Sequence, residues 1–241
     1  RQADPLTGES VEVLWVKGSG GDLGTMKLDG FATLYLARLQ ALKGRYRGRE
    51  HEDEMVALLA HCTFDLNPRA ASIDTPLHAF VPQEHVDHMH PDAVIALAAA
   101  KDGERLTREI YGGKVGWLAW QRPGFDLGLK LGEACAAHPE WNGIVLGGHG
   151  LFTWGKSAKE CYENTLATIR KAAAFLDERK SRAPFGGESV TALPEDVRRA
   201  FVAELAPVLR GKLSSETRKV MHFDDSADVL AFVDSKRMAE L

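Results

Sequence analysis

The chain has 241 residues, of which 44% are hydrophobic and 27% are charged, and its 30 Lys and Arg against 34 Asp and Glu give a formal net charge of −4. A globular protein of this size buries a core without needing disulfides. The balanced charge, which forms no basic stripe, argues against nucleic acid as a partner. The longest strongly apolar run, residues 93–100, is far shorter than the roughly 20 residues of a membrane span, so no membrane partner is expected.

The three cysteines are widely spaced and form no C-x-x-C pattern, which favours reduced, buried thiols in a cytoplasmic protein. The first residues contain neither a methionine nor a signal-peptide pattern. We therefore interpret the chain as a fragment of a longer cytoplasmic protein.

Hydrophobic periodicity switches between strand and helix spacing over the first 180 residues, which predicts a mixed α/β fold. We expect strands at residues 11–16 and 85–90, and a strand, a tight turn and a second strand over residues 141–154. Helices are predicted at residues 29–43, 51–61, 92–100 and 126–137. A capping box that begins at Ser157 starts a long helix, expected to end near Lys180.

The composition changes after residue 180. Residues 181–193 are rich in Gly, Pro and Ser, which predicts a linker, and two helices are expected after it, at residues 194–210 and 226–241. The sequence thus predicts one domain over residues 1–180 and a linker with a helical appendage over residues 181–241.

Three of the nine histidines form a candidate metal site. His88 and His90 stand two apart in a predicted strand, so their side chains share one face about 7 Å apart, whereas His85 is expected to face away. His149 lies between glycines in a turn that lets the imidazole project. Three neutral imidazoles leave an open coordination position on zinc, as in catalytic sites. An H-x-H pair alone also fits a surface or structural role.

A metal of this kind needs a partner that transfers protons, and Asp74 supplies a carboxylate upstream of the histidines. A turn or N-cap role before Pro76 is the alternative interpretation of Asp74.

These motifs resemble the class II aldolase/adducin family over roughly residues 11–180. More narrowly, residues 13–20 and 75–80 are similar to the aldolase part of bifunctional rhamnulose-1-phosphate aldolase/short-chain dehydrogenase proteins, and residues 222–226 to the segment before their dehydrogenase part. The resemblance implies a three-layer fold with a central, mainly antiparallel sheet flanked by helices. The motifs are Ser72-x-Asp74 with His78, then His88-x-His90-Pro91, then Gly147-Gly148-His149-Gly150.

The resemblance also implies an activity, which is cleavage of a small phosphorylated ketose, here L-rhamnulose 1-phosphate, to dihydroxyacetone phosphate and L-lactaldehyde. The metal would bind the substrate's C2 carbonyl and C3 hydroxyl oxygens, and the carboxylate would move the proton. A homotetramer is implied, with a proton-donating tyrosine from a neighbouring subunit, for which Tyr111 is the candidate. By this resemblance the ion, usually Zn²⁺, is bound by His88, His90 and His149, the acid is Asp74, and the phosphate is bound by Ser19, Gly20 and Ser72.

The chain departs from the family pattern at several places. Asp74 stands where many members have Glu, the stretch between Asp74 and His88 is compressed, the loop lacks the Asn that usually follows its first glycine, and the helix expected before the first strand does not fit ahead of Val11. Other functions remain open on the same fold, namely a sugar-phosphate epimerase or dehydratase and a non-catalytic adducin-like module. The run Gly18-x-Gly20-x-x-x-Gly24 imitates a dinucleotide-binding fingerprint, but no helix is expected to start inside it. A Schiff-base aldolase would need a desolvated lysine, and none is evident.

Overall fold

The computed structural model describes residues 1–67, 69–180 and 183–240, and the chain divides into two compact units, Arg1–Glu178 and Arg179–Leu241. Residues 181–182, at the start of the predicted linker, and residue 241, at the end of the predicted terminal helix, lie outside the described residues.

The first unit begins with two antiparallel ribbons. Strand β1 (Gln2–Ala3) pairs with β2 (Ser10–Val11), and β3 (Val13–Lys17) pairs with β4 (Phe31–Tyr35), in a register that sets Lys17 opposite Phe31. The helix predicted at residues 29–43 is therefore wrong in its first part, since helix α1 is confined to Leu36–Ala41. The run Phe-Ala-Thr-Leu-Tyr is rich in residues that favour strands, and a short apolar run fits either periodicity.

A sheet of four strands forms the centre of this unit, in the order β5 (His85–Met89), β8 (Gly150–Gly155), β7 (Gly143–Leu146) and β6 (Val115–Leu118). The β5–β8 and β8–β7 pairs are antiparallel and the β7–β6 pair is parallel. The prediction of a mainly antiparallel central sheet is confirmed. Strand β6 was not predicted, because it is only four residues long and contains a glycine.

Among the described residues of the first unit, seven α-helices accompany these strands, with α1 already given. The others are α2 (Glu52–Leu58), α3 (Thr75–Phe80), α4 (Asp92–Ala98), α5 (Gly103–Tyr111), α6 (Phe125–Ala137) and α7 (Ala158–Arg179). Short 3-10 helices cover Leu23–Thr25, Leu28–Gly30, Leu42–Arg45, Arg49–His51 and Leu59–Cys62.

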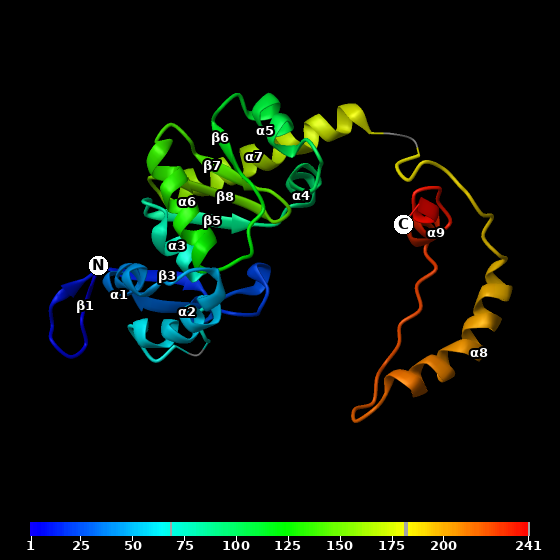
Figure 1. The fold of residues 1–241 in the computed structure, drawn as a ribbon, viewed down its shortest axis with the longest axis horizontal. Coiled ribbons are helices and arrows are strands. Elements are labelled where there is room, and N and C mark those ends of the chain that lie inside the picture. Colours follow the sequence, from blue (N-terminus) through cyan, green and yellow to red (C-terminus); the bar gives the residue numbers. More distant parts are fainter. Residues whose placement is uncertain (68, 181–182, 241) are drawn as a thin grey trace. The chain divides into compact units, whose positions relative to one another are not determined.

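Helices cover both faces of the central sheet (Figure 1). On one face Ile144 and Phe152 pack with Leu77 of α3 and Leu131 of α6, and on the other face residues of β7 and β8 pack against α4, α5 and α7. Helices α3 and α6 also contribute to a second core beneath the β3–β4 ribbon, so they form a layer between ribbon and sheet. The predicted class of fold, a helix-flanked α/β sheet, is confirmed. All three cysteines, Cys62, Cys135 and Cys161, are buried and unpaired as expected.

A buried carboxylate fixes the start of α6. Glu52 of α2 is 3% exposed and accepts hydrogen bonds from the backbone N–H groups of Phe125 and Asp126, both at 2.8 Å, and from the Tyr46 hydroxyl at 3.1 Å. Helix N-termini leave N–H groups without partners inside the helix, and a negative charge there is favourable. Glu52 therefore links α2 to α6 across the second core.

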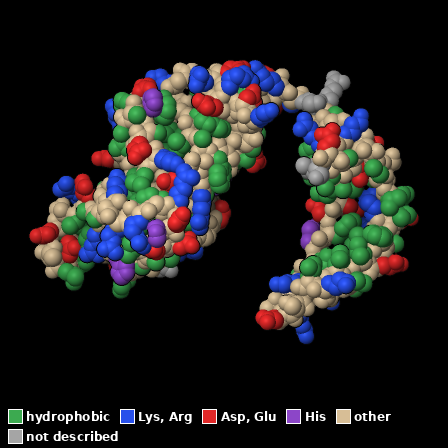
Figure 2. Space-filling model, in the orientation of Figure 1, with side chains coloured by type: hydrophobic (Ala, Val, Ile, Leu, Met, Phe, Trp, Pro, Cys, Tyr) green, Lys and Arg blue, Asp and Glu red, His purple; other side chains and the backbone are tan. Residues whose placement is uncertain are grey.

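The second unit contains α8 (Glu195–Leu213), α9 (Ala227–Val233) and a 3-10 turn at Met238–Glu240. The helix predicted at residues 226–241 is thus shorter than expected. Figure 2 shows hydrophobic side chains along α8, where Phe201 is 61% exposed. Arg198 of α8 pairs with Asp225 at 2.9 Å, which fixes the segment before α9. Within the described residues, neither this unit nor the first has a helix long and apolar enough to cross a membrane.

Replacing Glu52 tests its capping role. We expect Glu52→Gln to lower the free energy of unfolding by about 1–3 kcal/mol, because the amide accepts more weakly and brings a buried NH₂ group without a partner. Urea unfolding followed by circular dichroism measures this loss. The control is Glu54→Gln, on the same helix as Glu52. It removes an exposed ion pair between Glu54 and Arg47, and should change the free energy of unfolding by less than about 0.5 kcal/mol. Equal losses in both variants would contradict the capping role.

Candidate metal centre and substrate cavity

Two adjacent strands bring the three histidines together. In the β5–β8 pairing His88 stands directly opposite Phe152, and its ring stacks on the phenyl ring with centroids 4.2 Å apart. His90 follows the last residue of β5, and His149 immediately precedes the first residue of β8. The register of one antiparallel pair therefore places all three imidazoles at the same end of the sheet.

The imidazoles are close enough to share one ion. The Nε2 atoms of His88 and His90 are 3.0 Å apart, and the His149 ring centroid is 5.0 Å from each of the other two. One ligating nitrogen from each residue lies within 4.8 Å of the others, so the three residues form a group that could hold a single metal ion. His85, as expected, is outside this cluster.

The turn before β8 requires glycine at two positions. Gly148 has a φ of +64°, in the left-handed region that other residues adopt at a cost. A Cβ atom on Gly150 would stand 2.5 Å from Cδ2 of His90, too close for two carbon atoms. The glycines on either side of His149 thus let the turn approach His90.

Asp74 lies beside the histidines at the start of α3. Its backbone N–H donates to the Ser72 hydroxyl at 3.2 Å, while Oδ1 of its carboxylate is buried and has no hydrogen-bond partner. Burial raises the pKa of Asp74, and the nearby His149 and His90 act in the opposite direction. A buried carboxylate that is not fully hydrogen-bonded is available to exchange a proton.

The environment keeps His88 and His149 neutral. Burial lowers the pKa of His88 to about 2, with a smaller contribution from neighbouring imidazoles, and burial likewise lowers the pKa of His149. Nδ1 of His149 is buried without a partner. Neutral imidazoles with unused nitrogen atoms are the form that binds a metal ion, so the donor set fits a divalent cation such as zinc.

A cavity of about 320 Å³ adjoins this cluster. Its walls include His88, Asp74 and Ser72, together with Ser19 and Gly20 of the glycine loop. The loop is held to the Ser72 segment because the Ser19 N–H donates to the Ala70 carbonyl at 2.9 Å. The structure thus brings together all of the phosphate-binding and acid residues expected from the sequence.

Tyr111 is not brought to this site. It is 3% exposed and packs with α4 and α7 on the opposite face of the sheet from Phe152, and its hydroxyl donates to the Thr168 carbonyl at 3.2 Å. Burial raises the pKa of Tyr111 well above its usual value. Within one chain, Tyr111 is therefore a core residue.

Lys17 and His78 are among the cavity residues that were not assigned a role from the sequence. His78 belongs to the motif that contains Asp74, and its ring lies 6.2 Å from that of His88. Lys17 directly precedes the glycine loop, which is the only signal that pointed to it. The glycine run itself leads into the Leu23–Thr25 turn and then β4, so the helix that a dinucleotide fingerprint requires is absent from these described residues.

The family is now evident from comparison. The family model described as the Class II Aldolase and Adducin N-terminal domain matches residues 7–176, which include the three histidines, Asp74 and the glycine loop. The chain belongs to this family. The match ends near the end of α7, so it covers the first unit of this class II aldolase-like protein rather than the second.

Relatives agree with this assignment. The N-terminal class II aldolase domain of a conserved protein from Thermoplasma acidophilum is 29% identical, with a TM-score of 0.66 over 73% of this chain and 79% of that chain. An aldolase II superfamily protein from Pseudomonas syringae, 15% identical with a TM-score of 0.51 over 87% of this chain and 81% of that one, shares the fold. The uncharacterized oxidoreductase YuxG of Bacillus subtilis is 40% identical over 95% of this chain, which spans 33% of that relative's length.

Metal analysis tests the centre of this aldolase-family domain. The purified chain, incubated with zinc and desalted, is expected to hold about one ion per chain by elemental analysis. His149→Ala should weaken binding at least about 100-fold, because it removes a ligand rather than an outer contact. His85→Ala, on the same strand as His88 but outside the cluster, is the matched control. Equal zinc content in all three proteins would contradict the site.

Acid should destabilise the metal-free aldolase-like domain. Burial lowers the pKa of His78 to about 4 and that of His88 to about 2, so these imidazoles take up protons near pH 6.5 when unfolded but resist them when folded. The unfolded state binds more protons between these values, and the unfolding temperature should fall as the pH decreases from 7 to 5. Differential scanning fluorimetry should show a shallower fall for His78→Gln. A flat profile, or an unchanged slope in the variant, would contradict neutral buried histidines.

Proposed function

We propose that this domain is a metal-dependent aldolase that cleaves a ketose 1-phosphate to dihydroxyacetone phosphate and a short aldehyde. L-Rhamnulose 1-phosphate is the expected substrate and L-lactaldehyde the expected second product. The observation that carries the proposal is the buried Oδ1 atom of the Asp74 carboxylate, which has no hydrogen-bond partner and lies beside three clustered imidazoles. A non-catalytic interaction module does not require a carboxylate oxygen without a hydrogen-bond partner next to three imidazoles.

His88, His90 and His149 are the residues that would hold the ion. A bound divalent cation supplies Lewis-acid stabilisation of the negative charge that develops on substrate oxygen during C–C cleavage. The chain contributes the placement of these ligands: the His88 ring stacks on Phe152, and the missing side chain of Gly150 leaves room for the His90 ring.

Asp74 is the proposed proton carrier. Reverse aldol cleavage removes a proton from a substrate hydroxyl and returns one to the carbon that the departing aldehyde leaves, so one positioned group can serve both steps. The raised pKa of the Asp74 carboxyl favours its holding a proton between them. The free Oδ1 atom is the proposed point of exchange.

Polar groups of the cavity wall form the proposed phosphate site. Ser19 and Ser72 provide hydroxyl donors, and Gly20 provides a backbone amide with no side chain in front of it. Loops of this kind bind phosphate through several N–H and O–H donors. The cavity volume of about 320 Å³ lies within the usual range for small-ligand sites.

Proton donation by Tyr111 does not form part of this proposal, because its hydroxyl is buried and already bonded to a core carbonyl. A homotetramer, with residues from a neighbouring subunit completing the cavity, remains a proposal from the family resemblance. So does a short-chain dehydrogenase part in a longer protein, for which the name of the B. subtilis relative is consistent support. A sugar-phosphate epimerase or dehydratase would use the same metal ligands, and product analysis separates these reactions.

Replacement of Asp74 tests the mechanism. In Asp74→Asn we expect kcat for release of dihydroxyacetone phosphate from L-rhamnulose 1-phosphate to fall at least about 100-fold, because the amide cannot carry the proton. Zinc content and unfolding temperature should stay close to the wild-type values. Asp53→Asn, at an exposed ion pair with Arg122, is the control and should be fully active.

Two results would contradict this assignment. One is a normal cleavage rate in Asp74→Asn. The other is covalent labelling of a lysine when substrate and borohydride are added together, because that product is formed only by a Schiff-base enzyme. Conversion of the sugar phosphate without release of a three-carbon phosphate would favour the epimerase or dehydratase.

A further inference from the structure

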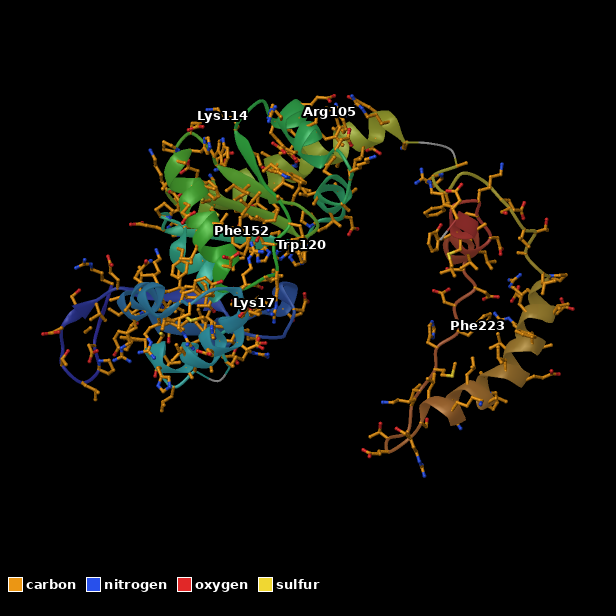
Figure 3. All side chains as sticks on the ribbon, in the orientation of Figure 1. Lys17, Arg105, Lys114, Trp120, Phe152 and Phe223 are labelled. Atoms are coloured by element: carbon orange, nitrogen blue, oxygen red, sulfur yellow. The ribbon has the colours of Figure 1, made fainter. Side chains whose placement is uncertain are left out.

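A single cationic side chain lies among the residues that form the cavity wall. Lys17 is the last residue of β3, and no other lysine or arginine lines the cavity among the described residues. Figure 3 shows Lys17 on the β3–β4 ribbon and Phe152 on the central sheet. The cation therefore belongs to the same stretch of the wall as Ser19 and Gly20, in a cavity that His88 also lines.

The charge of Lys17 is not neutralised by the chain. Its Nζ donates to the carbonyl oxygens of Gly20, at 2.7 Å, and Gly18, at 3.3 Å. No ion pair joins it to an Asp or Glu within the described part of the sequence. An ammonium group has three donor hydrogens, so two carbonyl acceptors leave one hydrogen and the full positive charge available. A half-buried cation in this state favours a bound anion.

The remaining donors of the glycine loop are neutral. Ser19, Gly20 and Ser72 offer hydroxyl and amide hydrogens, which bind any oxygen-rich group but do not compensate two negative charges. Arg69 lies beside the loop, with its guanidinium 3.4 Å from the position of a Cβ on Gly21, but it lines two other cavities, of about 230 and 590 Å³, and not this one. Lys17 lines both this cavity and the one of about 230 Å³, so it is the cation placed to contact a ligand beside His88.

We infer that Lys17 determines the specificity of this cavity, selecting a substrate that carries a phosphate monoester over the same sugar without it. The inference rests on the proposed function and adds a residue to it. Lys17 supplies a positive charge that compensates the phosphate, and the neutral loop supplies hydroxyl and amide donors around it. A purely structural role, in which Nζ only tethers the Gly20 carbonyl, is the competing explanation, and it predicts no discrimination between phosphorylated and unphosphorylated ligands.

Binding of inorganic phosphate to the zinc-loaded chain tests this directly by isothermal titration calorimetry. We expect Lys17→Met to weaken binding at least about tenfold, because a hydrogen bond to a charged group is lost, and Lys17→Arg to retain most of it. Lys27→Met, at an exposed lysine near the loop but outside the main cavity, is the matched control and should bind as the wild type. Any binding of phosphate to zinc itself would persist in Lys17→Met as a weaker residual signal.

Kinetics provide the second readout. For Lys17→Met we expect KM for L-rhamnulose 1-phosphate to rise at least about tenfold, with little change in turnover of unphosphorylated L-rhamnulose. A structural tether would instead change both substrates equally. Zinc content and unfolding temperature confirm that each variant is folded. If Lys17→Met does not fold, phosphate binding by Lys17→Arg is compared with phosphate binding by Lys27→Met, and loss of binding in folded Lys17→Arg alone overturns the inference.

The outcomes separate this inference from the proposed function. No phosphate binding by the wild type, equal binding by Lys17→Met, or loss of binding in a folded Lys17→Arg overturns the role of Lys17, even if cleavage is observed. Phosphate binding that depends on Lys17 supports the inference even if L-rhamnulose 1-phosphate is not cleaved, in which case the aldolase assignment fails and a phosphate-ester site remains.

Discussion

The antiparallel pairing of β5 with β8 is the constraint on which the site depends. Because His88 stands opposite Phe152 in this register, His90 and His149 are carried to the same end of the two strands. A shift of one residue would turn His88 to the opposite face of the sheet and replace its stacking partner. Phe152 is buried in the core and also stacks on the His88 ring. Its burial therefore fixes the position of the histidine cluster as well as the packing of the sheet.

The other half of the cavity comes from a different layer. The β3–β4 ribbon carries Lys17, Ser19 and Gly20, and α3 lies between this ribbon and the sheet with Asp74 at its start. Gly18 makes this arrangement possible, because a Cβ there would stand 2.8 Å from Cβ of Arg69 where the loop meets the following segment. The positive charge of Lys17 and the glycine loop thus come from the ribbon, while the three histidines come from the sheet. The proposed phosphate site and the proposed metal site therefore depend on the packing of different cores.

The sequence predicted the cluster of three histidines better than the other walls of the cavity. The spacing of His88 and His90, and the glycines around His149, are local signals that do not depend on distant packing. The strand at Phe31–Tyr35 was missed because its apolar residues fit a helix as well, and pairing with β3 decided the matter. Lys17 could not be selected from the sequence, because only the structure shows that it lines the cavity and forms no ion pair with a described Asp or Glu. Likewise, only the packing of α5 shows that Tyr111 lies in the core.

The site is assembled from stretches that are far apart in the chain, at Lys17–Gly20, Ser72–His78, His88–His90 and His149. Contacts of such long sequence separation form late in folding, because the intervening loops must close first. No isolated hairpin or helix of this unit carries all three imidazoles with Asp74. An ion that binds them therefore binds only the completed unit and stabilises it by mass action. Metal affinity and the folded population of this unit are consequently a single linked equilibrium.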